Sequence, residues 1–120
     1  MKALIVEDNA LMRHTIKSIL LKLGHEVVGE AEDSVSAIKA YSEFKPEVVF
    51  LDLVLPGKSG VEILDEIRGV NPEARIVVVT AVEQDEIDRR LSNKGVTAII
   101  RKPFSYEEFK AAVSRIQPAA

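Results

Sequence analysis

The chain has 120 residues, a length that suits one domain with a single core. Hydrophobic residues make up 47% and charged residues 29%, which is typical of a soluble globular protein, and the absence of cysteine excludes disulfides, thiolate chemistry and Cys-based zinc sites. The formal charge of −3 argues against direct nucleic-acid binding, and without a long apolar run or a signal-peptide pattern we expect a cytoplasmic protein that does not enter a membrane.

Five short apolar runs alternate with helical patterns along the chain. Most runs contain no alternating polar residues, which indicates strands covered on both faces, as in a parallel sheet. Gly24, Gly95 and the Asn71-Pro72 pair mark helix ends, and Ser105 with Glu108 has the spacing of a capping box. In chain order the sequence predicts strand 3–6, helix 10–23, strand 26–30, helix 34–44, strand 48–53, helix 61–70, strand 75–80, helix 85–94, strand 98–100 and helix 106–116.

This alternation predicts an α/β fold with a five-stranded, doubly wound parallel sheet. Strand–helix–strand crossovers are right-handed almost without exception. Of the common doubly wound orders, the five-stranded one is 2-1-3-4-5, which makes strands 1 and 3 neighbours at the switch point. We expect one domain over residues 1–120, with 117–120 as a tail or the start of a linker.

Polar residues stand at the carboxyl ends of four of these strands, the edge where ligands bind in open parallel sheets. Three carboxylates, one hydroxyl and one ammonium group suit a divalent cation together with a phosphoryl group. The residues are Glu7 and Asp8 after the first strand, Asp52 at the end of the third, Thr80 ending the fourth and Lys102 after the fifth.

Each of these residues also has an ordinary structural interpretation. Asp8 suits a helix cap, Thr80 a strand interior and Lys102 a surface position. Asp52 is harder to explain in this way, because the flanking runs VVFL and LVL are apolar and expected to be buried. A buried carboxylate without a partner is costly, so a partner for Asp52 is expected.

Four short motifs together resemble the receiver domain of two-component response regulators, which has the CheY-like fold. The resemblance covers essentially the whole chain, and the motifs occur in the family's order at strand ends. They are the acidic pair Glu7-Asp8, the block DLVLPGKSG over residues 52–60 (similar to D-x-x-[LM]-P-x-x-[SDN]-G), the pair Thr80-Ala81, and Lys102-Pro103-Phe104.

The resemblance implies that Asp52 is the phosphoacceptor. It would take a phosphoryl group from the phosphohistidine of a sensor kinase or phosphotransfer protein, or from a small phosphodonor. Mg²⁺ (or Mn²⁺) would be held by Asp8, Asp52 and the backbone carbonyl of Val54, with Glu7 holding a bound water. An octahedral cation that keeps several waters needs only two or three protein oxygens.

The resemblance also implies roles for the remaining motif residues. Lys102 would pair with Asp52 before phosphorylation and with a phosphoryl oxygen afterwards, and a cis peptide bond is expected before Pro103. Thr80 would donate to another phosphoryl oxygen and act as the switch residue. Many receivers have Tyr or Phe three residues before the lysine, but this chain has Ile99, so the Thr80 shift must be read out differently.

Two further positions set the lifetime of the acyl phosphate in this family, one two residues after the acceptor and one two residues after the switch threonine. They are Val54 and Val82 here. Neither side chain can orient a water, so we expect slow self-dephosphorylation.

The expected partners are a sensor histidine kinase or phosphotransfer protein and a downstream target or separate output domain. The resemblance implies that the target uses the face built by segments 85–94, 98–100 and 106–116. A dimer through this face is not supported, because segment 95–98 contains no acid.

Two other classes remain as alternatives. A flavodoxin-type mononucleotide binder would need a glycine- or hydroxyl-rich loop where Glu7-Asp8-Asn9 stands. An aspartyl-phosphate hydrolase of the haloacid dehalogenase type would need an acid two residues after its nucleophile, where this chain has Val54. We therefore expect a signalling switch and not an enzyme that turns over.

Overall fold

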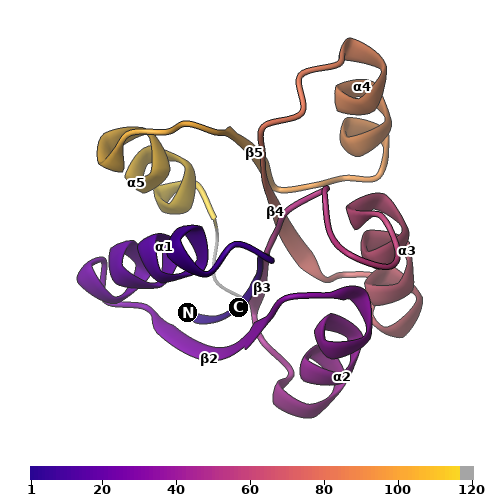
Figure 1. Cartoon of the computed structure of the whole chain (residues 1–120), viewed down its shortest axis with the longest axis horizontal. Helices are drawn as coiled ribbons and strands as arrows, with labels where there is room; N and C mark the ends of the chain where they lie inside the picture. The colour runs from indigo at the N-terminus through magenta and orange to yellow at the C-terminus, as the bar shows by residue number, and fades with distance from the viewer. Residues whose placement is uncertain (117–120) are drawn as a thin grey trace.

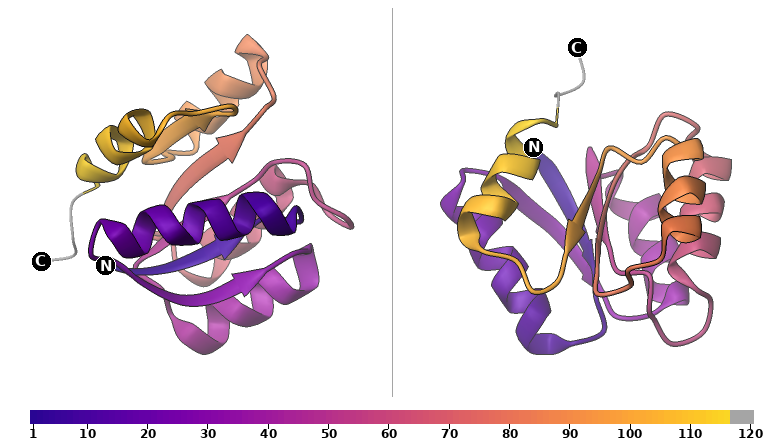
Figure 2. Two further views of the ribbon diagram at one scale, coloured as in Figure 1. Left: turned by 60° about the vertical axis from the view of Figure 1, so that its left-hand side comes forward. Right: turned by 90° about the horizontal axis from the view of Figure 1, so that it is seen from above.

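A central parallel sheet separates two layers of helices in the computed structural model, which describes residues 1–116 (Figure 1). The strand order is β2-β1-β3-β4-β5, as predicted. Helices α1 and α5 cover one face, and α2, α3 and α4 cover the other (Figure 2, right). The elements are β1 (Lys2–Val6), α1 (Ala10–Lys22), β2 (Glu26–Ala31), α2 (Ser34–Phe44), β3 (Val48–Leu51), α3 (Gly60–Val70), β4 (Arg75–Thr80), α4 (Asp85–Asn93), β5 (Ala98–Arg101) and α5 (Tyr106–Ser114).

The apolar runs form strands because both faces of the sheet are covered. In β1, Ala3 and Ile5 pack toward α1 and α5, whereas Leu4 and Val6 pack toward α2 and α3. The central strands β3 and β4 alternate between the two cores in the same way. A strand buried on both sides has no need of polar residues, which explains the uninterrupted Val and Ile.

Strand β3 ends at Leu51 and not at residue 53, as the apolar run had suggested. The amide of Asp52 still donates to the carbonyl of Val6 at 3.0 Å, but its side chain then accepts from the amide of Val54 and the chain turns. Leu53 is buried because it packs into the core toward α3 and not because it extends the strand. This early end puts the Asp52 side chain at the edge of the sheet.

Side-chain caps fix where four of the helices near this edge begin, and Asp33 forms the capping box of α2. Asn9 caps α1 by accepting from the amide of Met12 at 2.8 Å, so Asp8 is not the cap. Ser59 and Ser105 form capping boxes at α3 and α5, the latter as predicted. Caps of this kind satisfy amides at the helix start that have no intrahelical partner, and they fix the direction of each preceding loop. Within residues 1–116, no helix is long and apolar enough to cross a bilayer.

Candidate functional site

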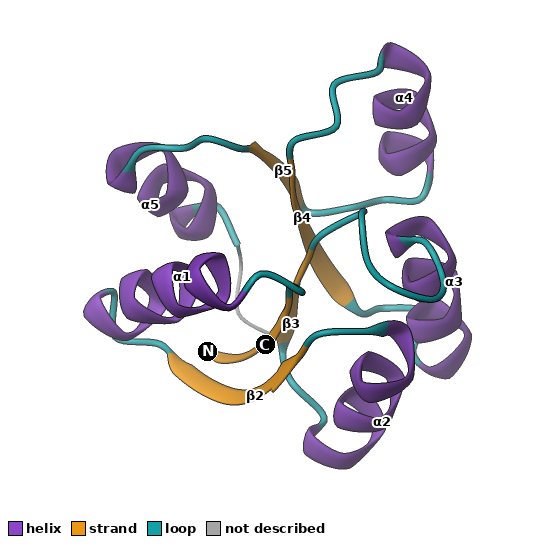
Figure 3. Cartoon of the chain, viewed as in Figure 1, coloured by secondary structure: helices purple, strands orange, loops and turns teal. Residues whose placement is uncertain are grey.

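Three carboxylates meet where β1 and β3 end side by side. One oxygen from each of Glu7, Asp8 and Asp52 lies within 4.8 Å of the others. Val6 and Leu51 are in register, so the residues that follow them are neighbours. Loops connect the ends of the strands to the helices around the sheet (Figure 3). Glu7 is 1% exposed and Asp52 is 6% exposed, whereas Asp8 faces solvent. The strand order thus brings Asp52 together with two acids that lie 45 and 44 positions earlier in the sequence.

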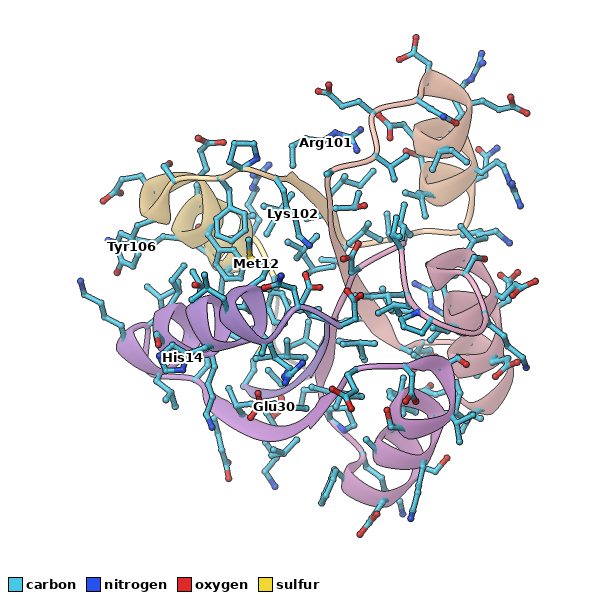
Figure 4. The ribbon with its side chains drawn as sticks, in the orientation of Figure 1. Met12, His14, Glu30, Arg101, Lys102 and Tyr106 are labelled. Atoms are coloured by element: carbon cyan, nitrogen blue, oxygen red, sulfur yellow. The ribbon has the colours of Figure 1, made fainter. Side chains whose placement is uncertain are left out.

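Lys102 bridges the two buried acids. Its ammonium group donates to Asp52 Oδ2 at 2.9 Å and forms an ion pair with Glu7 Oε1. The side chain extends from the end of β5 toward the middle of the sheet (Figure 4). The peptide bond between Lys102 and Pro103 is cis, as expected. The predicted pairing of Lys102 with Asp52 is therefore present.

Burial and the hydrogen bonds between Glu7 and Lys102 shift the pKa of each residue in opposite directions. Burial raises the pKa of the Glu7 carboxyl above its ordinary value, although the hydrogen bond from Lys102 opposes the effect. Burial also acts to lower the pKa of Lys102, but its hydrogen bonds to Glu7 and Asp52 outweigh this and raise the pKa. Lys102 therefore remains a cation at neutral pH. The site contains three carboxylates and one ammonium group, so a bound cation would be attracted electrostatically.

The acidic loop after β1 is held by its own backbone and by Arg13. Glu7 Oε2 accepts from the amide of Asn9 at 3.1 Å, and the Glu7 carbonyl accepts from Arg13 Nη1 at 2.8 Å. Arg13 also pairs with Glu30 on β2 at 3.3 Å. The sequence did not reveal this role, because an arginine on the first helix is most simply a surface residue.

The loop after β3 is shaped by a tight approach at Gly60. A Cβ at this position would lie 2.4 Å from the Cα of Leu53 and 2.6 Å from the carbonyl oxygen of Asp52, so only glycine fits. The amide of Val54 donates to Asp52 Oδ1 at 3.1 Å and fixes the carboxylate. The expectation that the flanking LVL is buried is wrong for Val54, whose side chain is 63% exposed.

Thr80 is fully buried at the end of β4, the strand next to β3. Its hydroxyl oxygen accepts from the amide of Val82 at 3.3 Å, and its carbonyl accepts from the amide of Lys102 at 3.0 Å. Among the described residues its hydroxyl makes no hydrogen bond to Asp52. Thr80 is thus tied to the next loop and not to the acidic cluster.

The three remaining aliphatic positions of interest lie on the α2–α4 side of the sheet. Ile99 is partly buried against that core. Val54 and Val82 both line a groove of about 350 Å³ between α3 and α4. Val54 and Val82 therefore line one groove. Their backbone amides donate to the side chains of Asp52 and Thr80, respectively.

The chemistry of this donor set fits a hard divalent cation. All three carboxylates offer oxygen, the ligand that Mg²⁺ and Mn²⁺ prefer. Two buried acids and one exposed acid would suffice for an ion that keeps part of its water shell, and Asp8 provides the solvent-facing side.

Comparison with known proteins identifies relatives over nearly the full length. Residues 3–114 match the response regulator receiver domain family. The chain is 34% identical over 115 residues to the chemotaxis protein CheY of Thermotoga maritima, with 96% of each chain covered. It is 36% identical over 114 residues to CheY of Bacillus subtilis, with 95% of each covered.

A solved structure has the same architecture. The crystal structure of a CheX–CheY–BeF₃–Mg²⁺ complex from Borrelia burgdorferi superposes with a TM-score of 0.90 at 23% identity, covering 94% of this chain and 86% of that chain. The sequence match and the strand-end acids leave neither the flavodoxin-type nor the phosphatase alternative favoured. The chain belongs to the response regulator receiver domain family and has the phosphoacceptor function of two-component signalling.

Proposed function

We propose that Asp52 is the residue that accepts the phosphoryl group. The observation that carries this assignment is the environment of its carboxylate: Lys102 and the amide of Val54 each hold one oxygen, and two further acids lie within 4.8 Å. Asp52 is also the buried acid closest in sequence to the loop that Gly60 shapes. Glu7 is buried as well, but it is held by Lys102, Asn9 and its neighbouring strand.

In this proposal an oxygen of Asp52 attacks the phosphorus of a phosphohistidine. The P–N bond breaks as the P–O bond forms, and the departing imidazole nitrogen takes up a proton from solvent. Positioning and charge neutralisation supply most of the rate in such transfers, because the protein takes no other covalent part. The carboxylate is already oriented by two hydrogen bonds, so it needs little reorientation before it attacks.

A divalent cation held by Asp8, Asp52 and the Val54 carbonyl, with Glu7 holding one of its waters, would neutralise the negative charge that develops on the phosphoryl oxygens. Lys102 would then leave the Asp52 carboxylate and pair with a phosphoryl oxygen. Thr80 would turn its hydroxyl from the Val82 amide toward another phosphoryl oxygen. This turn releases the Val82 amide and so moves the loop after β4.

The partners in this proposal are a sensor histidine kinase or phosphotransfer protein and a downstream protein. The crystal structure of a CheY relative in complex with CheX supports a protein target. We place the contact with the target on α4, β5 and α5, because the loop after β4 leads directly into α4. We further propose that residues 1–120 act as one domain and a switch, not as an enzyme; the tail proposed at 117–120 lies outside the described residues.

Incubation with acetyl phosphate and Mg²⁺ tests this function. A receiver accumulates one phosphoryl group per chain, detected by intact-mass spectrometry, and releases inorganic phosphate slowly. Loss of the adduct at mildly alkaline pH with hydroxylamine would identify an acyl phosphate. Continuous release of phosphate without an adduct would instead indicate a phosphatase.

The cation site gives a separate prediction. Mg²⁺ should raise the melting temperature of the wild type, because the ion relieves repulsion among three close carboxylates. At tenfold the dissociation constant the gain is ~1.4 kcal/mol, or about 4–8 °C for a domain of this size. Asp8→Ala should lose most of this shift, measured by thermal denaturation with and without EDTA. Glu43→Ala, an exposed acid on α2, is the matched control and should keep it. An unchanged Mg²⁺ response in Asp8→Ala would refute the role given to Asp8.

A further inference from the structure

Arg101 joins three segments at the edge of the site. It is paired with Thr80 in the register of β4 and β5. Its Nη1 donates to the carbonyl oxygen of Val82, and its Nη2 forms an ion pair with Asp88 on α4. The side chain extends from β5 toward the segment that leads into α4 (Figure 4). One guanidinium group thus connects β5, the β4–α4 loop and the first turns of α4.

The loop residue held by Arg101 is the one that also contacts Thr80. The Val82 amide donates to the Thr80 hydroxyl at 3.3 Å, while the Val82 carbonyl accepts from Arg101. Both backbone polar groups of Val82 are therefore engaged, one by β4 and one by β5. Rotation of the Thr80 hydroxyl would free the amide only, and Arg101 would still restrain the loop.

Asp88 on α4 has Arg101 as its counterion. Asp88 Oδ2 pairs with Arg101, and Asp88 Oδ1 is buried without a hydrogen-bond partner in the described part of the chain. A carboxylate that loses its counterion while partly buried is driven toward water. Without Arg101, an outward movement of the first turns of α4 would lower the free energy by hydrating the Asp88 carboxylate.

From these contacts we infer that Arg101 is a positioning residue that holds the β4–α4 loop and α4 in the unphosphorylated arrangement and so opposes switching. The inference rests on the proposed function, since switching means the response to a phosphoryl group on Asp52. Within residues 1–116, no hydrogen bond or ion pair joins Arg101 to Asp52. Arg101 acts through Val82 and Asp88.

Titration with beryllium fluoride and Mg²⁺, which mimics the acyl phosphate, tests the coupling. If the restrained state is the one that binds poorly, loosening it raises the competent fraction and tightens the apparent affinity. Arg101→Gln should lower the half-saturating beryllium fluoride concentration by roughly two- to fivefold, as expected for a partly exposed ion pair. The ¹⁹F NMR signal of the bound fluoride gives the occupancy.

Matched variants separate the ion pair from a general charge effect. Asp88→Asn should tighten binding as Arg101→Gln does, and the double variant should add little, because both remove the same contact. Arg101→Lys keeps a charge for Asp88 and should fall between. Arg89→Gln removes an exposed arginine from α4, the helix that contains Asp88, and should leave the affinity unchanged. Unchanged or weaker affinity in Arg101→Gln, or an equal gain in Arg89→Gln, would overturn the inference.

Amide exchange in the unmodified protein tests the restraint without any phosphoryl mimic. Arg101→Gln should speed hydrogen exchange in residues 81–85, and Arg89→Gln should not. Unchanged exchange in that loop would overturn the inference even if the proposed function holds. Failure of the wild type to bind beryllium fluoride would instead refute the proposed function, and with it the coupling to switching.

Discussion

Asp52→Asn should abolish phosphorylation by acetyl phosphate. The amide is isosteric with the carboxylate, so it leaves the fold and the loop at Gly60 in place, but it has no anionic oxygen with which to attack phosphorus. The adduct seen by intact-mass spectrometry should fall below detection, a loss of at least about a hundredfold in rate. Asp65→Asn, an acid on α3 paired with Lys94, is a control that should be phosphorylated normally.

The same substitution should not unfold the protein. Lys102 keeps its ion pair with Glu7 when Asp52 becomes neutral, so no buried charge is left alone. One of three mutually repelling acids is removed, and we expect a melting temperature without Mg²⁺ at least equal to that of the wild type. An adduct of equal yield in Asp52→Asn would show that another residue is the acceptor. A large fall in melting temperature would show that Asp52 mainly serves to hold Lys102.

The convergence of the site was predictable because it follows from topology alone. Parallel strands end at one edge, and the order 2-1-3-4-5 makes β1 and β3 neighbours, so Glu7, Asp8 and Asp52 had to meet. Lys102 could reach them from β5 because its stem is long. The strands were predictable from their apolar runs because both faces of this sheet are covered.

Details that depend on individual side-chain contacts were not predictable. The apolar run continues through Leu53, which is buried by packing near α3, so hydrophobicity could not reveal that the strand ends at Leu51. Val54 in the same run points outward. The contacts of Arg13 and Arg101 depend on which rotamers their long side chains adopt among distant neighbours, and no periodic pattern encodes that.

The acyl phosphate should be long-lived, and Val54 and Val82 should be the reason. Hydrolysis needs a water in line with the phosphorus, and neither side chain can hydrogen-bond to one. Both line the groove between α3 and α4, and Val54 is 63% exposed beside the acceptor loop. Water can therefore reach the region, but these two aliphatic side chains give it no fixed orientation. Poor orientation of the attacking water raises the barrier to hydrolysis, and polar side chains at these positions could lower it.

Val54→Asn with Val82→Glu should shorten the lifetime by roughly ten- to a hundredfold, since one orienting contact can contribute ~1–3 kcal/mol. The decay is measured after removal of the phosphodonor at neutral pH, by intact mass over time. Val35→Asn is the matched control, because Val35 is a similarly exposed valine (78%) on α2, and its decay should equal that of the wild type. Both variants keep Asp52, Lys102 and Thr80, so they should still be phosphorylated. Loss of the wild-type phosphoryl group within seconds, or an unchanged rate in the double variant, would contradict the role given to these valines.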